Sequence, residues 1–161
     1  MRSIILEGPN GSGKSTLAGE LELELDRPFY HATRPTDSNQ AIHLANAQLE
    51  NILMNKPAIY DRSHALSRIV YQHKTIGAVE YDLLYAHVRF LQHHCTIIYC
   101  TGQGEHDTNK PHYNDRLIKE VQEAKSGIDD AYYEHFIALK HIAYNFEKDS
   151  FKGLLLKLDA V

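Results

Sequence analysis

A glycine-rich run near the N-terminus has the residue types and spacing that bind phosphate. Residues 8–15 read Gly-Pro-Asn-Gly-Ser-Gly-Lys-Ser, which fits the pattern G-x-x-x-x-G-K-S/T. Its glycines let backbone N–H groups curl around an anion, and the start of a following helix adds partial positive charge. In such a loop Lys14 reaches the β- and γ-phosphates of a nucleoside triphosphate, and the Ser15 hydroxyl ligates Mg²⁺. The residues expected to bind the nucleotide are Gly8, Asn10, Gly11, Ser12, Gly13, Lys14, Ser15 and Thr16.

This loop motif is shared by proteins that use ATP and proteins that use GTP, so other residues must distinguish them. A GTPase needs an N-K-x-D motif after an apolar strand to read guanine. Asn109-Lys110-Pro111-His112 lacks the aspartate and lies in a polar stretch. A motor or transporter ATPase would need partner motifs. We therefore expect ATP and Mg²⁺ as the cofactors.

A carboxylate and an arginine follow a second apolar run. Asp61 and Arg62 come directly after Ala58-Ile59-Tyr60. In a parallel sheet, the carboxyl end of a neighbouring strand is where a further Mg²⁺ partner belongs. An adjacent arginine can hold the phosphate of an acceptor molecule through two parallel hydrogen bonds. Because a phosphate dianion is already a nucleophile, it needs cations rather than a general base. These residues predict phosphoryl transfer to a monophosphate.

The stretch that begins with this pair resembles part of a known enzyme family. Residues 61–72 are similar to the D-R-Y/H and S-x-x-A-Y-Q segment of thymidylate kinases, and Leu6-Glu7-Gly8 and Thr33-Arg34-Pro35-Thr36 resemble that family too. Residues 157–160 resemble its last strand, whose end lies beside adenine. The chain also looks like the small thymidylate kinase-like proteins of many bacteriophages. The resemblance implies a nucleoside monophosphate kinase that converts a (deoxy)nucleoside monophosphate, with dTMP or a related deoxynucleotide favoured, to the diphosphate.

The same resemblance assigns roles to charged residues. Asp61 would lie near Mg²⁺, and Arg62 and Arg34 would bind the acceptor monophosphate. The family carries several arginines in its lid or phosphate loop, whereas the lid-like segment here, residues 101–126, offers Arg116 as the candidate clamp for transition-state charge. The expected catalytic residues are Lys14, Asp61, Arg62 and Arg116, and the expected metal ligands are Ser15 and Asp61.

Four residues of the resembling segment would contact the acceptor nucleoside. Ser67, Arg68 and Gln72 lie where the family contacts the base, and Tyr71 matches a ring that packs on the sugar and disfavours a 2′-hydroxyl. Arg68 stands where the family has a small polar residue. Because an arginine fork pairs with two acceptors, as on guanine, these residues do not define the base.

Two other functions stay open. A kinase for a hydroxyl group, on a deoxynucleoside or a hydroxymethylated base in DNA, needs a carboxylate base, and Asp37 lies close enough in sequence to supply one. A non-enzymatic protein could use the loop only for nucleotide-dependent partner binding. Binding to nucleic acid is disfavoured, since 17 Lys and Arg stand against 21 Asp and Glu, a formal net charge of −4.

Short apolar runs alternate with helical periods along the chain. Leu17, Leu21 and Leu25 recur every four residues, Ser38 is an N-cap candidate before a second helix, and Val79 and Leu83 belong to a third. A last helix is expected over residues 132–146. The predicted strands are Ser3–Glu7, Phe29–Thr33, Ala58–Asp61, Thr96–Cys100 and Leu154–Leu158.

This alternation predicts an α/β P-loop NTPase fold of the nucleotide-kinase kind. We expect one P-loop kinase domain over residues 1–161, a three-layer sandwich with a parallel sheet of about five strands. No apolar run is long enough for a signal peptide or a membrane span, so a cytoplasmic protein is expected, in the host cytoplasm if a phage encodes it. Cys95 and Cys100 should lie on opposite faces of one strand as free thiols. The family resemblance implies a homodimer.

Overall fold

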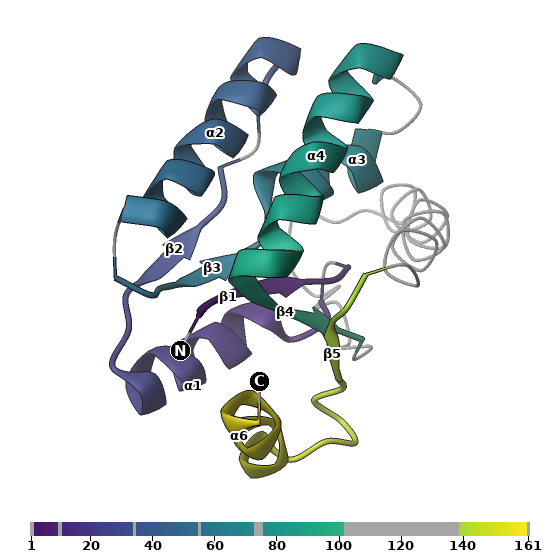
Figure 1. Cartoon of the computed structure of the whole chain (residues 1–161). Coiled ribbons are helices and arrows are strands. Elements are labelled where there is room, and N and C mark those ends of the chain that lie inside the picture. Colours follow the sequence, from purple (N-terminus) through teal and green to yellow (C-terminus); the bar gives the residue numbers. More distant parts are fainter. Residues whose placement is uncertain are drawn as a thin grey trace, which may run out of the picture.

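The described part of the chain forms a parallel sheet with helices on both faces (Figure 1). The computed structural model describes residues 2–9, 11–33, 35–54, 56–72, 76–101 and 139–160, without the side chain of Gln72. Within these ranges five strands pair in the order β2-β3-β1-β4-β5, and every pairing is parallel. The predicted fold class is therefore confirmed. The strands are β1 (Ser3–Glu7), β2 (Phe29–His31), β3 (Ile59–Asp61), β4 (Cys95–Cys100) and β5 (Ile142–Tyr144).

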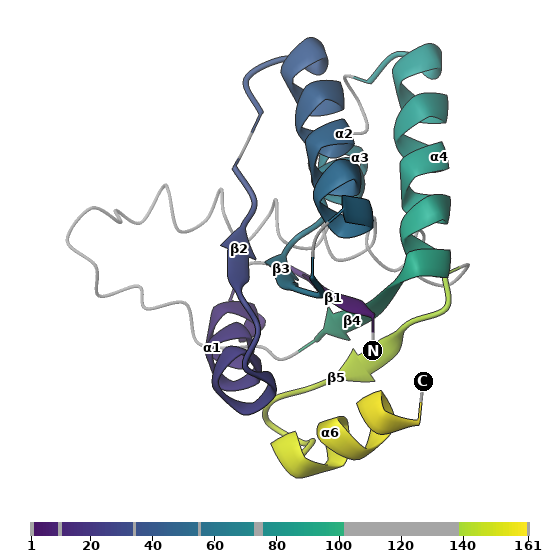
Figure 2. The same ribbon diagram turned by 60° about the vertical axis from the view of Figure 1, so that its left-hand side comes forward.

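The helices divide into two layers. In both views α1 and α6 lie on one side of the sheet, whereas α2, α3 and α4 lie on the other (Figures 1 and 2). Two hydrophobic clusters fill the space on the side of α2, α3 and α4, and one fills the space beside α1 and α6. The helices are α1 (Lys14–Leu25), α2 (Ser38–Met54), α3 (His64–Gln72), α4 (Ala78–His94) and α6 (Phe151–Asp159).

The central strands are buried on both faces because helices cover both. In β1, Ile4 and Leu6 pack with α1 and α6, while Ile5 between them packs with the cluster on the opposite face. The two thiols of β4 divide in the same way. Cys95 joins the cluster that contains Ile5, and Cys100 joins the cluster that contains Leu6. Both thiols are buried and free, as predicted.

The C-terminal elements differ from the sequence prediction. Residues 154–158, predicted as a strand, lie in helix α6, and the last strand of the sheet is β5, which had been placed inside a helix. In α6 the Ser150 side chain accepts a hydrogen bond from the Gly153 N–H and caps the helix. Leu154 and Leu158, four residues apart, are buried, whereas Leu156 is 65% exposed, which is a helical period. The likeness of residues 157–160 to a last strand is therefore wrong.

The start of α2 also differs from the prediction. Asp37, not Ser38, caps this helix, since Asp37 Oδ1 accepts the Gln40 N–H at 2.9 Å and the Asp37 carbonyl accepts the Ala41 N–H. This frees the Ser38 hydroxyl for a contact with another helix. No helix within the described ranges is long and apolar enough to cross a membrane.

Candidate nucleotide-binding site

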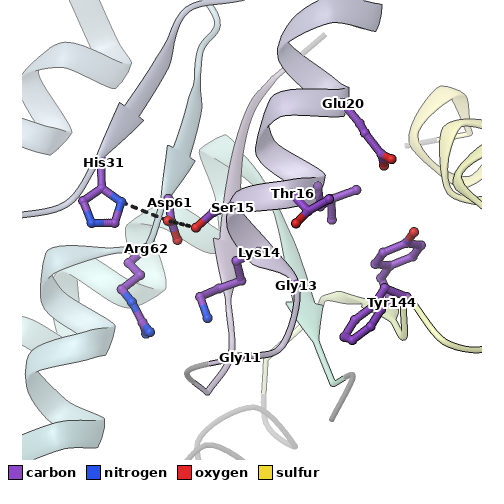
Figure 3. A pocket seen from close by; sticks show the side chains of 12 residues that line it. Gly11, Gly13, Lys14, Ser15, Thr16, Glu20, His31, Asp61, Arg62 and Tyr144 are labelled. Atoms are coloured by element: carbon purple, nitrogen blue, oxygen red, sulfur yellow. Dashed lines mark hydrogen bonds and ion pairs between the residues drawn. The ribbon is translucent and has the colours of Figure 1, made fainter. Parts of the chain in front are cut away.

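The phosphate loop joins the end of β1 to the start of α1 (Figure 3). At two of its positions the backbone conformation and the close approach of neighbouring atoms leave room only for glycine. Gly8 has φ +139°, and a Cβ there would lie 2.3 Å from the Cys100 carbonyl oxygen. Gly13 has φ +79°, and a Cβ there would lie 2.7 Å from the Phe146 ring. Any larger residue would push the loop away from β4 or from Phe146. Asn10 lies outside the described residues.

Lys14 is held inside the loop rather than extended into solvent. Its ammonium donates to the Pro9 carbonyl at 2.5 Å and to Ser12 Oγ at 3.2 Å. Burial, and then the nearby Arg62 cation, lower the pKa of Lys14 to about 8, although Asp61 and Glu7 oppose the shift. A bound polyphosphate would favour the charged ammonium, so this lysine is suited to an anionic ligand.

A carboxylate, a hydroxyl and an imidazole meet beside the loop. Asp61 Oδ2 accepts from Ser15 Oγ at 3.2 Å and lies 2.9 Å from His31 Nδ1 (Figure 3). Because an ionised carboxylate only accepts hydrogen bonds, the His31 Nδ1 is the donor. Asp61 is 2% exposed, and its Oδ1 is buried with no hydrogen-bond partner among the described residues.

These oxygens fit a magnesium ion. Mg²⁺ takes oxygen ligands and is commonly held by one carboxylate, a hydroxyl, water and substrate phosphates. The Ser15 hydroxyl lies at the start of α1, and the carboxylate oxygen Asp61 Oδ1 still lacks a partner within the described ranges. Ser15 and Asp61 would therefore hold the ion, and His31 would orient the carboxylate.

Arg62 is bent back toward the loop from the end of β3. Its φ is +85°, a left-handed conformation that is uncommon for a residue with a side chain. Its Nη1 donates to the Gly8 carbonyl at 3.1 Å, and its guanidinium carbon lies 5.1 Å from the centre of the Tyr71 ring. The Tyr71 ring thus supports a cation beside the phosphate loop. The Arg62 N–H is fixed by the Leu6 carbonyl at 2.9 Å.

Arg68 lies in a buried network that joins three helices. Its Nε donates to Glu80 Oε1 at 2.9 Å and its Nη2 donates to Ser38 Oγ at 3.1 Å, while Ser38 Oγ donates to Glu80 Oε2 at 2.7 Å. Burial acts to raise the pKa of Glu80, but the hydrogen bonds from Arg68 and Ser38 outweigh it, and the net shift is downward. Among the described residues, Arg68 thus contacts Glu80 and Ser38 through Nε and Nη2, and its contact with a base stays a prediction.

One open cavity of about 700 Å³ brings most of these groups together. Lys14, Ser15, Asp61 and Arg62, all singled out by the sequence, line it, whereas Ser67, Arg68 and Tyr71 do not. Arg34, Arg116, the side chain of Gln72 and most of the lid-like segment, 102–126, lie outside the described residues. The cavity is lined by Gly11, Gly13, Lys14, Ser15, Thr16, Leu17, Glu20, His31, Asp61, Arg62, Tyr144 and Phe146.

Sequence reasoning missed several lining residues. His31 ends β2 beside Asp61, and its place at the carboxyl end of a parallel strand was the available signal. Tyr144 ends β5 and lies with Glu20 on the α1 side of the loop (Figure 3), and Phe146, two residues after β5, also lines the cavity. Tyr144 and Phe146 were missed because the last strand was assigned to the wrong residues.

Comparison with known proteins finds likeness only at the level of structure. No family model matches the chain, and no curated protein matches it by sequence. The YorR protein of Bacillus subtilis, solved with phosphorylated GDP, is similar with a TM-score of 0.69 and 18% identity over 98% of this chain and 93% of its own. Deoxyadenosine kinase from M. mycoides with bound dATP gives 0.59 and 14%, covering 98% of each chain.

A thymidylate kinase is similar to the same degree. The enzyme from Ehrlichia chaffeensis gives a TM-score of 0.58 and 14% identity over 99% of this chain and 96% of its own. Shikimate kinase from Acinetobacter baumannii gives 0.55. At such identities the likeness establishes the fold, which is that of the P-loop nucleotide kinases.

Proposed function

We propose that the protein is a magnesium- and ATP-dependent kinase that phosphorylates a (deoxy)nucleoside monophosphate to the diphosphate. A dTMP-like deoxynucleotide is the favoured acceptor. The observation that carries this proposal is the joint placement of Lys14, Ser15, Asp61 and Arg62 in one cavity at the phosphate loop. The resemblance to deoxyadenosine and thymidylate kinases supports it at the level of fold.

The donor side follows from the loop. Backbone N–H groups of the glycine-rich turn and the Lys14 ammonium would neutralise the β- and γ-phosphates of ATP. Magnesium, when bound, would supply further neutralisation of these phosphate oxygens. Ser15 and Asp61 would hold the ion, and His31 would keep the Asp61 carboxylate in place. Catalysis by this arrangement is positioning and charge stabilisation.

The acceptor side favours a phosphate over a hydroxyl. Arg62 places a cation next to the loop, where an acceptor phosphate would lie in line with the γ-phosphate, and Arg34 and Arg116 are proposed to add to it. A hydroxyl acceptor would need a carboxylate base. Asp37, the sequence candidate, is committed to capping α2 and does not line the cavity.

Contacts to the acceptor nucleoside are proposed for Ser67, Tyr71 and Gln72. Ser67 Oγ is buried and has no hydrogen-bond partner within the described part of the chain, so a base or sugar group can satisfy it. Arg68 is bound to Glu80 and Ser38, and we assign it to the shape of the acceptor side rather than to direct reading of the base.

The test is a coupled assay of ADP release with MgATP and each common nucleoside and deoxynucleoside monophosphate, with the nucleosides and shikimate as further acceptors. We expect turnover with at least one monophosphate, and a much lower but still measurable kcat in Arg62→Ala. Arg89→Ala, which removes an exposed arginine from α4, is the matched control and should keep full activity. Turnover with nucleosides alone would overturn the assignment of the acceptor. Tight ATP binding with no transfer would overturn the kinase itself.

A further inference from the structure

Gln48 is the one polar side chain among the buried residues of α2. It lies on α2 together with the buried Ala41 and Ala45, and it is 6% exposed. Both ends of its amide are used. Its Nε2 donates to the Arg62 carbonyl at 3.0 Å, and its Oε1 accepts the His64 N–H at 3.1 Å. One side chain therefore spans the turn between β3 and α3.

This turn contains the left-handed residue Arg62. Such a backbone conformation persists only where neighbouring groups hold it. Three residues outside the turn hold it. The Leu6 carbonyl accepts the Arg62 N–H, and Glu7 Oε1 accepts the Ser63 N–H at 2.6 Å. The Gln48 amide binds the Arg62 carbonyl and the His64 N–H. The first two belong to β1, which also leads into the phosphate loop. Gln48 is the contribution of α2.

We propose that Gln48 is a positioning residue for Arg62. By fixing the carbonyl of Arg62 and the N–H of His64, it sets the direction in which the Arg62 side chain leaves the backbone. That direction carries the guanidinium to the Gly8 carbonyl and onto the Tyr71 ring. The kinetic consequence rests on the proposed function, because it takes Arg62 as the clamp on the acceptor phosphate. The structural consequence does not.

The first experiment measures the turn itself, without any substrate. Gln48→Met keeps the length of the side chain and removes both hydrogen bonds. Amide hydrogen exchange of His64, followed by NMR, should become about ten-fold faster, which corresponds to the loss of one hydrogen bond. Ala41→Gly is the control, because it weakens α2 about two helical turns before Gln48 without touching the turn between β3 and α3. It should leave the exchange of His64 unchanged relative to neighbouring amides. Unchanged His64 exchange in Gln48→Met would overturn the proposal.

The second experiment asks whether Gln48 acts through Arg62. With the best acceptor, kcat of Gln48→Met should fall about 10²-fold, the scale for a catalytic group displaced by about an ångström. KM for ATP should stay the same, since the donor site is untouched. In an Arg62→Ala background the same substitution should change kcat less than about two-fold, because the group that Gln48 positions is already gone. A change of about two-fold is the deviation from additivity that unrelated sites show. An equal loss of kcat in both backgrounds would contradict the proposal.

The two readouts separate the possible failures. If the wild-type protein phosphorylates no acceptor, the proposed function fails, and the exchange of His64 alone decides whether Gln48 holds the turn. If the wild-type protein is active and Gln48→Met has normal exchange and normal kcat, the positioning role fails while the kinase assignment stands.

Discussion

Replacement of Arg68 by methionine should destabilise the fold rather than weaken substrate recognition. The side chains of Arg68 and Glu80 are only 8% and 10% exposed, and each is bonded to the other and to Ser38. Arg68→Met leaves the Glu80 carboxylate buried beside a single hydroxyl. Removing one partner of a buried ion pair costs about 3–5 kcal/mol in unfolding free energy.

The lower end of that range is appropriate here, since about a tenth of each side chain still reaches solvent. For 161 residues the entropy of unfolding is about 0.34 kcal/mol per kelvin, so a loss of about 3 kcal/mol lowers Tm by about 9 °C. Glu80→Met should cost a similar amount. The double variant should recover most of the loss, because an apolar pair of similar volume replaces the ion pair without leaving a buried charge.

Thermal and urea unfolding of the three variants, alongside acceptor KM, provide the assay. The pKa of Glu80 is lowered in the folded protein, so its stabilisation is present above the ordinary value of 4.5 and is lost as pH falls through the lowered pKa. The stability difference between wild type and Glu80→Met should therefore shrink below pH 4.5. A normal Tm for Arg68→Met together with a raised KM for the acceptor would refute this reasoning. It would indicate that Arg68 contacts the base of the acceptor.

Three further predictions concern the cavity and the strands. Lys14→Ala should lower kcat about 10²–10³-fold with the far-UV circular dichroism spectrum unchanged. Lys152→Ala, which removes an exposed lysine of α6, should have no effect; a retained rate in Lys14→Ala would contradict the phosphate-loop role. His31→Ala should weaken Mn²⁺ binding to the ADP complex about 10–100-fold, as measured by EPR. His31→Asn should bind Mn²⁺ almost as well as the wild type, because its amide can replace Nδ1, and equal affinities in both variants would contradict the orienting role. Because burial raises the pKa of Cys95 and Cys100 to about 12, neither thiol should react with Ellman's reagent in the native protein at pH 8, and both should react after unfolding; rapid labelling of the native protein would show that β4 is less well covered than described.

The loop, Asp61 and Arg62 could be predicted from the sequence because their spacing is local. Gly8 to Ser15 is one turn between a strand and a helix, and an apolar run ending in Asp-Arg places both residues at the same edge of the sheet. The alternation of strands and helices could be predicted for a similar reason, because the hydrophobic periodicity of each helix or strand lies within one short stretch of sequence.

The partners of Arg68 and Arg62 could not be predicted, because they come from distant segments. Arg68 lies 30 residues from Ser38 and 12 from Glu80, and no periodic pattern links them. In the sequence, Gln48 and His31 look like ordinary helix and strand residues. Only the packing of α2 brings Gln48 to the Arg62 carbonyl, and only the pairing of β2 with β3 brings His31 to Asp61. The C-terminal error had another cause: Ile142–Tyr144 is too short for a strand pattern, and the leucine-rich run 154–158 suits a strand or a buried helix equally.

Transfer of labelled phosphate tests the central claim most directly. Wild-type protein would be incubated with Mg²⁺, [γ-³²P]ATP and the best monophosphate acceptor from the coupled assay, and the products separated by thin-layer chromatography. The cavity built by Lys14, Ser15, Asp61 and Arg62 predicts label in the nucleoside diphosphate, and far less label there after the same time with Lys14→Ala. Label found only in inorganic phosphate would contradict it. So would transfer to the nucleoside in a parallel reaction, with no transfer to the monophosphate.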